Sequence, residues 1–217
     1  MNPSPDGPAG TVGILDLGLG NLASVARALQ AVGLSVRVSA DPAELDDLAG
    51  LIVPGVGAFA AALARLQAGG GAVLVREFLA RGRPVLGICL GMQVMCAWGE
   101  EGGGAPGLGL VAARVRRLPP GRPVPHVGWN QVHWSDPLQL FCDLQPGTWF
   151  YFSHAYYVDA PPSLQNGDSA RTAMAEYGVP VLAALEIPPL YGVQFHPEKS
   201  GAAGLRVLAA FGGRCVC

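Results

Sequence analysis

Cys89 is the residue whose neighbours in this sequence most favour covalent catalysis. It stands in Gly87-Ile88-Cys89-Leu90-Gly91, between an apolar run and a segment with helical spacing. Glycines permit the tight strand-to-helix turn that lifts a nucleophile above a sheet. A thiolate there would lie at a helix N-terminus, and the N–H of Leu90 could stabilise an oxyanion. A lone cysteine is most often a buried structural residue, but the flanking glycines favour a catalytic one.

A base for this thiol can be sought among the histidines, which are His126, His133, His154 and His196. Pro197 follows His196 and disfavours helix at that residue, so we expect an extended segment. Side chains two residues apart then point the same way, so Glu198 could orient the His196 ring while its other nitrogen faces Cys89. A strand-end histidine beside a solvated glutamate is the commoner arrangement. Together with Cys89, however, the pattern predicts a catalytic triad.

The segment Pro54-Gly55-Val56-Gly57 is a candidate for the other half of an oxyanion hole. Two glycines allow unusual backbone dihedrals and the close approach of a ligand, although most such turns are only turns. An N–H of Val56 or Gly57 could complement that of Leu90. Phosphate and dinucleotide sites are not indicated. The phosphate-loop spacing G-x-x-x-x-G-K-[ST] is missing, and Gly18-Leu19-Gly20 lacks the third glycine of the dinucleotide motif.

Alternating strands and helices must position these residues. In the first half we predict strands at residues 12–17, 35–39, 51–54 and 84–89, and helices at 22–32, 58–67, 73–81 and 90–98. The second half predicts strands at 111–118, 127–134, 148–158, 170–177, 181–187 and 190–196, then a helix at 204–211. The fold class is therefore α/β, with a mostly parallel, mixed central sheet flanked by helices and extended by antiparallel strands.

Composition narrows the class of protein. Hydrophobic residues make up 50% and charged residues 14% of 217, which suits one domain over residues 12–217 after a flexible Pro/Gly-rich lead at 1–11. The net charge of -2, without a basic stripe, argues against nucleic-acid and membrane-surface partners. No apolar run approaches the roughly 20 residues that span a bilayer, and the N-terminus does not resemble a signal peptide. We therefore expect a cytosolic protein.

The cysteines give no sign of a structural framework. There are five, scattered and without a C-x-x-C pair, so neither disulfides nor a zinc site is predicted. Cys215 and Cys217 are expected in a frayed C-terminal tail without a specific role.

The segment Gly87-Ile88-Cys89-Leu90-Gly91-Met92-Gln93, together with His196-Pro197-Glu198, resembles the class I glutamine amidotransferases. In that family the cysteine attacks the side-chain amide of glutamine, the histidine moves the proton, and the glutamate orients the histidine. Ammonia leaves, and water hydrolyses the glutamyl thioester. The resemblance implies a flavodoxin-like fold, glutamine as the substrate and no cofactor.

Further motifs narrow this resemblance to the glutaminase subunits of imidazole glycerol phosphate synthases. They are Pro54-Gly55-Val56-Gly57-Ala58-Phe59, Pro125-His126-Val127-Gly128-Trp129-Asn130, Phe150-Tyr151-Phe152-Ser153-His154-Ala155-Tyr156-Tyr157 and His196-Pro197-Glu198-Lys199-Ser200-Gly201. Met92 agrees, because many other class I members have histidine there. The resemblance implies a heterodimer with a (β/α)₈-barrel subunit that receives the ammonia. The barrel makes imidazole glycerol phosphate, for histidine biosynthesis, and aminoimidazole carboxamide ribotide.

Carried over residue by residue, the resemblance assigns Gln93, Ala155 and Tyr156 to glutamine binding, and Trp129, Asn130, Tyr151 and Lys199 to the partner interface or tunnel mouth. Ser153 and Ala155 depart from the family, which more often has valine at the first position and serine or threonine at the second. If the family contact at Ala155 uses a hydroxyl group, glutamine binding would be weaker here.

Three other interpretations stay open at this stage. Another class I amidotransferase would share the triad but not the Pro125–Asn130 motif. A stand-alone cysteine hydrolase acting on γ-glutamyl compounds would need no partner and would be highly active alone. A non-catalytic binding module of the same fold would be expected to lack Cys89, His196 or Glu198, and all are present.

Overall fold

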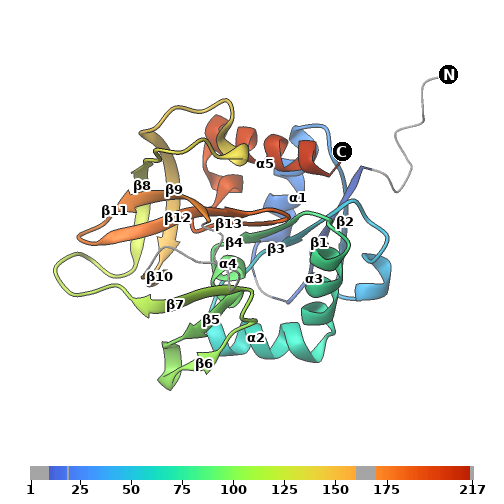
Figure 1. The fold of residues 1–217 in the computed structure, drawn as a ribbon, viewed down its shortest axis with the longest axis horizontal. Coiled ribbons are helices and arrows are strands. Elements are labelled where there is room, and N and C mark those ends of the chain that lie inside the picture. Colours follow the sequence, from blue (N-terminus) through green and yellow to red (C-terminus); the bar gives the residue numbers. More distant parts are fainter. Residues whose placement is uncertain (1–9, 19, 160–169, 216–217) are drawn as a thin grey trace.

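A seven-stranded mixed sheet forms the centre of the computed structural model, which describes residues 10–18, 20–159 and 170–215 (Figure 1). Its strand order is β11-β12-β13-β4-β3-β1-β2. The parallel strands are β1 (Thr11–Leu15), β2 (Ser35–Ser39), β3 (Gly50–Val53), β4 (Val85–Ile88) and β13 (Leu190–Val193). At one end of the sheet, β12 (Pro180–Ile187) and the edge strand β11 (Arg171–Glu176) are antiparallel. The predicted mixed sheet is thus confirmed.

Helices cover both faces of this sheet. Helices α1 (Leu22–Ala31) and α5 (Gly201–Arg214) pack on one face, and α2 (Phe59–Ala68) and α3 (Gly71–Ala80) on the other (Figure 1). The inner strands β3, β4 and β13 are buried along their whole length, which is why they appear in the sequence as continuous apolar runs. Asn21 caps helix α1, since its Oδ1 accepts a hydrogen bond from the Ser24 N–H at 3.2 Å.

Two smaller sheets stand beside the central one. Strands β5 (Cys96–Gly99), β6 (Ala105–Pro106), β7 (Val111–Arg117) and β10 (Tyr156–Val158) pair in the order β10-β7-β5-β6. Strands β8 (His126–Val132) and β9 (Thr148–His154) form a two-stranded antiparallel pair, here called the β8–β9 ribbon. Short 3₁₀ turns are η1 (Pro42–Glu44), η2 (Glu101–Gly103), η3 (Gln139–Phe141) and η4 (Pro197–Lys199).

Two predicted elements are each divided into two in the structure. The helix expected at 90–98 is only α4 (Leu90–Val94), and the rest of that segment becomes β5, because Cys96 and Trp98 pair with strand β7. The apolar run continues through both elements, so its periodicity could not locate the change. The strand expected at 148–158 breaks at Ala155, where the chain leaves β8 and turns to pair with β7.

The tail prediction was wrong for Cys215. This residue is 8% exposed, and its Sγ lies 3.4 Å from the carbonyl oxygen of Phe211. Cys217 and the expected lead at residues 1–9 lie outside the described residues.

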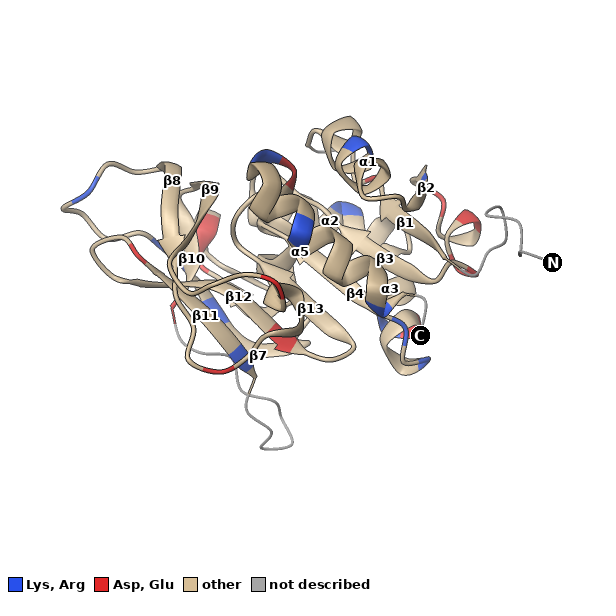
Figure 2. Cartoon of the chain, turned by 90° about the horizontal axis from the view of Figure 1, so that it is seen from above, with Lys and Arg blue, Asp and Glu red and all other residues tan. Residues whose placement is uncertain are grey.

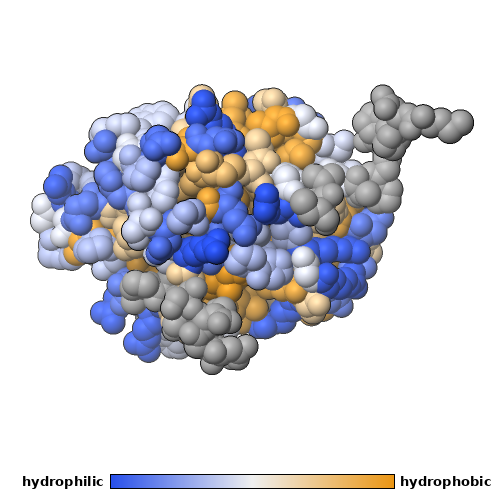
Figure 3. Space-filling view, turned by 45° about the horizontal axis from the view of Figure 1, so that its top comes forward, coloured by the Kyte–Doolittle hydropathy of each residue, from blue (hydrophilic) through white to orange (hydrophobic). Residues whose placement is uncertain are grey.

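The outside of the molecule is mixed in character. Lysine, arginine, aspartate and glutamate are scattered over the whole molecule, and the basic residues do not gather in a stripe (Figure 2). Apolar side chains reach the surface in patches that hydrophilic ones interrupt (Figure 3). Within the described part of the chain, no helix has the length and apolar character needed to cross a membrane.

Candidate active site

Cys89 occupies a strained turn between β4 and α4. Its φ of 54° and ψ of −111° make it the non-glycine residue with positive φ in the described part of the chain. The flanking glycines are required by packing. A Cβ at Gly91 would collide with the Val53 carbonyl oxygen, and one at Gly87 would lie 2.7 Å from the Met92 backbone. The predicted elbow is therefore present, although α4 is short and contributes little helix dipole.

His196 and Glu198 meet beside this cysteine. His196 follows strand β13, which pairs with β4 so that Val193 lies opposite Ile88. The His196 Nδ1 lies 2.8 Å from Glu198 Oε1, and the His196 ring also hydrogen-bonds Cys89. The predicted pairing is correct, but its cause differs from our expectation. His196 itself is extended, whereas residues Pro197–Lys199 form the turn η4 and bring the carboxylate back to the ring.

The electrostatic setting of His196 favours its charged form. Burial is the largest single effect and lowers the pKa of His196. Hydrogen bonds and charges of Cys89 and Glu198 together outweigh it and raise the pKa to about 9. Glu198 Oε2 is buried and finds no hydrogen-bond partner among the described residues, so only one carboxylate oxygen is used in holding the ring. The group can thus hold a proton taken from a nearby thiol.

A cavity of about 310 Å³ opens above Cys89. The predicted site residues that line it are Val56, Gly57, Cys89, Leu90, Gln93, Ala155, Tyr156, His196 and Lys199. The candidate nucleophile, the candidate base, the candidate oxyanion donors and the candidate glutamine contacts are therefore brought together. Glu198 does not line this cavity, and it contacts the His196 ring at Nδ1.

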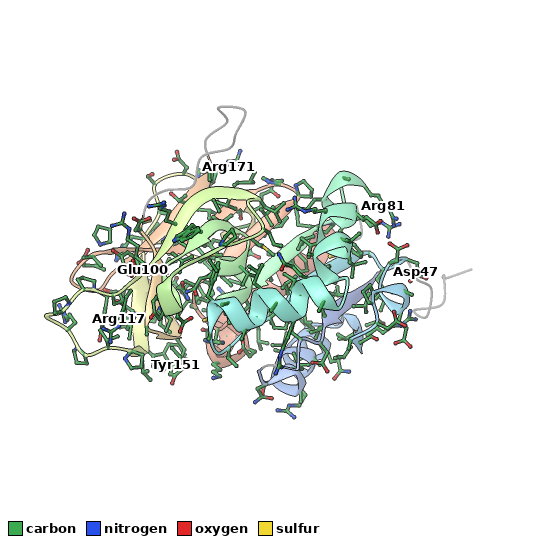
Figure 4. The ribbon with its side chains drawn as sticks, turned by 90° about the horizontal axis from the view of Figure 1, so that it is seen from below. Asp47, Arg81, Glu100, Arg117, Tyr151 and Arg171 are labelled. Carbon is green, nitrogen blue, oxygen red and sulfur yellow. The ribbon has the colours of Figure 1, made fainter. Side chains whose placement is uncertain are left out.

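The remaining predicted residues lie on the β8–β9 ribbon, outside the cavity lining. The Trp129 side chain is 51% exposed and packs edge-on against Tyr151, with 6.2 Å between ring centroids. Figure 4 shows Tyr151 at the end of the molecule opposite Asp47 and Arg81. Asn130 is engaged internally, because its Nδ2 donates to the Glu176 carbonyl oxygen at 2.9 Å.

The sequence analysis assigned no role to three polar residues at this site. Glu101 lines the cavity, and its Oε2 accepts the Phe59 N–H, which caps α2. His154 also lines it and hydrogen-bonds the Tyr156 carbonyl oxygen through Nδ1 at 2.8 Å. The side chain of Gln194 is fully buried, with Nε2 3.4 Å from Cys89 Sγ. Spacing could have indicated Gln194, since it precedes His196 by two residues.

Comparison with known proteins agrees with this geometry. A family model described as glutamine amidotransferase class-I matches residues 13–212. The chain is 49% identical over 204 residues to the imidazole glycerol phosphate synthase subunit HisH of Symbiobacterium thermophilum, which covers 94% of this chain and 93% of that one. It is 46% identical over 201 residues to the subunit of the same name from Moorella thermoacetica, with 93% of each covered.

Solved structures show the same fold at much lower identity. PurLQS from Thermotoga maritima matches with a TM-score of 0.70 at 17% identity, covering 93% of this chain and 96% of that one. A structure described as a glutamine amidotransferase matches with a TM-score of 0.67 at 22% identity, covering 93% and 98%. The chain therefore belongs to the class I glutamine amidotransferases, and among them to the family of the imidazole glycerol phosphate synthase subunits HisH.

Proposed function

We propose that this chain hydrolyses glutamine at Cys89 as the glutaminase subunit of an imidazole glycerol phosphate synthase, and delivers the ammonia to a barrel partner. One observation carries the proposal: Cys89 stands in a strained elbow and hydrogen-bonds His196, whose other ring nitrogen is held by Glu198 at 2.8 Å. The family of the chain supports the reaction class.

In the proposed reaction, His196 accepts the thiol proton of Cys89, and the thiolate attacks the side-chain amide carbon of glutamine. The amide oxygen becomes an oxyanion, with the N–H groups of Leu90 and of Val56 or Gly57 as proposed donors. His196 then gives its proton to the amide nitrogen, which leaves as ammonia. Water activated by the same ring hydrolyses the thioester, releases glutamate and restores the thiol.

Glutamine is proposed to bind in the cavity of about 310 Å³, which is near the lower end of the sizes usual for small-molecule sites. Gln93, Ala155 and Tyr156 remain the proposed contacts. Glu101 adds a carboxylate to the same wall, with a charge suited to the α-ammonium group of an amino acid. The Ala155 carbonyl oxygen accepts the Leu118 N–H at 2.9 Å and keeps a second lone pair, so a backbone contact to glutamine there could use either its N–H or its carbonyl oxygen.

The proposed partner is a (β/α)₈-barrel cyclase subunit of the HisF type, docked as a heterodimer over the β8–β9 ribbon. Val127 and Trp129 are 56% and 51% exposed on strand β8, as the apolar centre of an interface requires. Lys199 adds a cation at the rim of the cavity. Ammonia would then pass to the barrel without entering bulk water. A cytosolic location is part of this proposal.

The direct test replaces the nucleophile. Cys89→Ala should abolish glutamine hydrolysis, both in the chain alone and in the complex with the barrel subunit. The same complex should still make imidazole glycerol phosphate from ammonium salts, because the second reaction takes place on the barrel. Cys142→Ala, at an exposed cysteine, is the matched control and should keep full activity. Near-normal glutaminase activity of Cys89→Ala would refute the proposal.

A second test concerns regulation at residues 54–57. Gly57 has a φ of 101°, so this segment can reorient a peptide plane at low steric cost. One missing oxyanion donor lowers the rate by about 10²–10³-fold. We therefore expect low turnover in the chain alone, and higher turnover with the barrel plus its nucleotide substrate. Equal rates in all conditions would reject the switch, and high activity of the chain alone would favour a stand-alone hydrolase.

A further inference from the structure

Gln194 is a buried amide that the triad does not use, yet it touches the sulfur of the nucleophile. Its side chain is 0% exposed, and its Nε2 lies 3.4 Å from Cys89 Sγ. It lies two residues before His196, just after β13, and its backbone N–H donates to the Ala183 carbonyl oxygen at 2.8 Å. Gln194 and His196 therefore reach the same sulfur from one extended segment.

The partners of this amide decide which of its ends faces the sulfur. The Tyr156 carbonyl can only accept, so the group of Gln93 that lies 2.8 Å away must be its NH₂. That same nitrogen lies 2.8 Å from Gln194 Oε1 and donates its other proton there. The oxygen of Gln194 is thereby occupied, and its NH₂ group points at Cys89.

A second line of contacts fixes the Tyr156 carbonyl. It also accepts from His154 Nδ1 at 2.8 Å, which leaves His154 Nε2 to accept a proton from His126 Nδ1 at 3.1 Å. Every donor and acceptor in the series from His126 to Gln194 then has one assignment. The orientation of the Gln194 amide is held by neutral groups that do not titrate near neutral pH.

We propose that Gln194 donates a hydrogen bond to the sulfur of Cys89 and stabilises its thiolate, both before attack on glutamine and when the thioester is cleaved. This inference rests on the proposed function of Cys89. No proton is transferred from the amide. The thiol proton still goes to His196, and the Gln194 N–H only remains directed at the negative charge left behind. An uncharged donor does this without competing with His196 for the proton.

The alternative is that Gln194 only fills space. Burying an amide without partners costs free energy, whereas an apolar side chain of the same length would fill the position at no such cost. Both ends of this amide are bonded to residues of the site. The Ser153 carbonyl oxygen, 4.0 Å from the sulfur, can only accept hydrogen bonds and therefore cannot stabilise an anion there.

The test compares Gln194→Met, which keeps the length of the side chain and removes the donor, with the unmodified protein. The rate at which iodoacetamide alkylates Cys89 is followed across pH by mass spectrometry of the Cys89 peptide. Because a hydrogen bond to a charged group is lost, we expect the pH profile of alkylation to shift to higher pH and the alkylation rate at pH 7 to fall about three- to tenfold. Gln194→Glu should move the profile further in the same direction. Phe195→Leu is the control, since this buried ring packs on Phe150 and should lower stability without moving the profile.

A second measurement needs no substitution at Gln194. In the unmodified protein, the side-chain amide proton of Gln194 should shift downfield in the NMR spectrum as the sulfur ionises, and Cys89→Ser should abolish that shift. A folded Gln194→Met protein with an unchanged profile would overturn the inference, and so would a Gln194 amide signal that does not respond to pH. Both readouts follow the sulfur and not turnover, so failure of the glutaminase proposal would be seen separately, in the Cys89→Ala assay.

Discussion

The molecule contains two buried histidine sites that differ in charge. His196, after β13, is 3% exposed, and His154, at the end of β9, is 6% exposed. The pKa of His196 is raised to about 9, although burial opposes this, because Cys89 and Glu198 hydrogen-bond its ring. The pKa of His154 is lowered to about 3, mainly by burial and then by His126. Similar burial therefore gives opposite protonation.

The difference comes from the partners that each ring meets. His196 faces a carboxylate and a thiol, both of which can carry negative charge. His154 faces a neutral carbonyl and His126, whose own pKa burial lowers to about 4. A buried histidine can thus act as a proton acceptor where anionic groups surround it, and as a neutral, fixed hydrogen-bonding group where they do not.

Replacing each histidine in turn should give the largest contrast. His196→Ala removes the proposed base and should lower kcat/KM for glutamine by at least about 10³-fold. His154→Ala removes a neutral hydrogen-bonding group and should lower kcat/KM by less than about tenfold, mostly because the protein becomes less stable. Steady-state glutaminase assays of both variants in the complex would check this. If His154→Ala were the inactive variant and His196→Ala the active one, the base would be misassigned.

Removing the charge behind His196 should have a smaller effect. Glu198→Gln keeps a hydrogen-bonding group near Nδ1 but loses the carboxylate that stabilises the charged ring. Removing the carboxylate of a catalytic triad lowers kcat about 10²-fold less than removing the histidine does. We therefore expect Glu198→Gln to be markedly slower than the unmodified protein but clearly faster than His196→Ala. Equal loss in the two variants would show that Glu198 is as essential as the base itself.

The two sites should respond to pH in opposite directions. The native protein holds the His196 proton more tightly than the unfolded chain does. This contribution to stability is therefore complete below about pH 6.5 and is lost as pH rises through about 9. His154 and His126 have lowered pKa values, so their contribution is present above about pH 6.5 and is lost as pH falls toward 4 and then 3.

NMR titration of the ring resonances would measure these pKa values directly, and denaturant unfolding across pH would give the stability. Cys89→Ser should lower the pKa of His196, because one of the groups that raise it is lost, and should leave that of His154 in place. A His196 that titrates near its ordinary value of 6.5 in the unmodified protein would contradict the comparison.

The sequence predicted the residues of the His196 site far better than those of the His154 site. Cys89 could be recognised because its turn glycines are adjacent in sequence, and His196 with Glu198 because they form one short motif. The inner strands were predictable because a strand buried on both faces is apolar throughout. The contact of His126 with His154 depends on the β8–β9 register, and the contact of Gln194 with Cys89 needs the pairing of β13 with β4 in addition to its spacing from His196. No local pattern reports such pairings.

Lys199 lies where the segment that follows β13 meets strand β9, and replacing it should have the smallest effect of these substitutions. Its Nζ lies 5.7 Å from the centroid of the Tyr151 ring, beside backbone bonds that already connect the segments. The His196 N–H donates to the Tyr151 carbonyl at 2.8 Å, and the Tyr151 N–H donates to Ser200 Oγ at 3.0 Å. Because these bonds remain, Lys199→Met should lower the stability of the chain alone by less than about 1 kcal/mol.

The same substitution should leave glutamine hydrolysis by the chain alone nearly unchanged, since the triad does not depend on the Lys199 charge. In the complex it should weaken binding of the barrel subunit, or uncouple glutamine hydrolysis from synthesis, because the proposed interface loses a cation. Lys199→Arg keeps the charge and should behave like the unmodified protein. Calorimetric binding and the ratio of glutamate to synthase product would measure both effects. A loss of hydrolysis in the chain alone comparable to that of His196→Ala would place Lys199 within the catalytic group rather than at the interface.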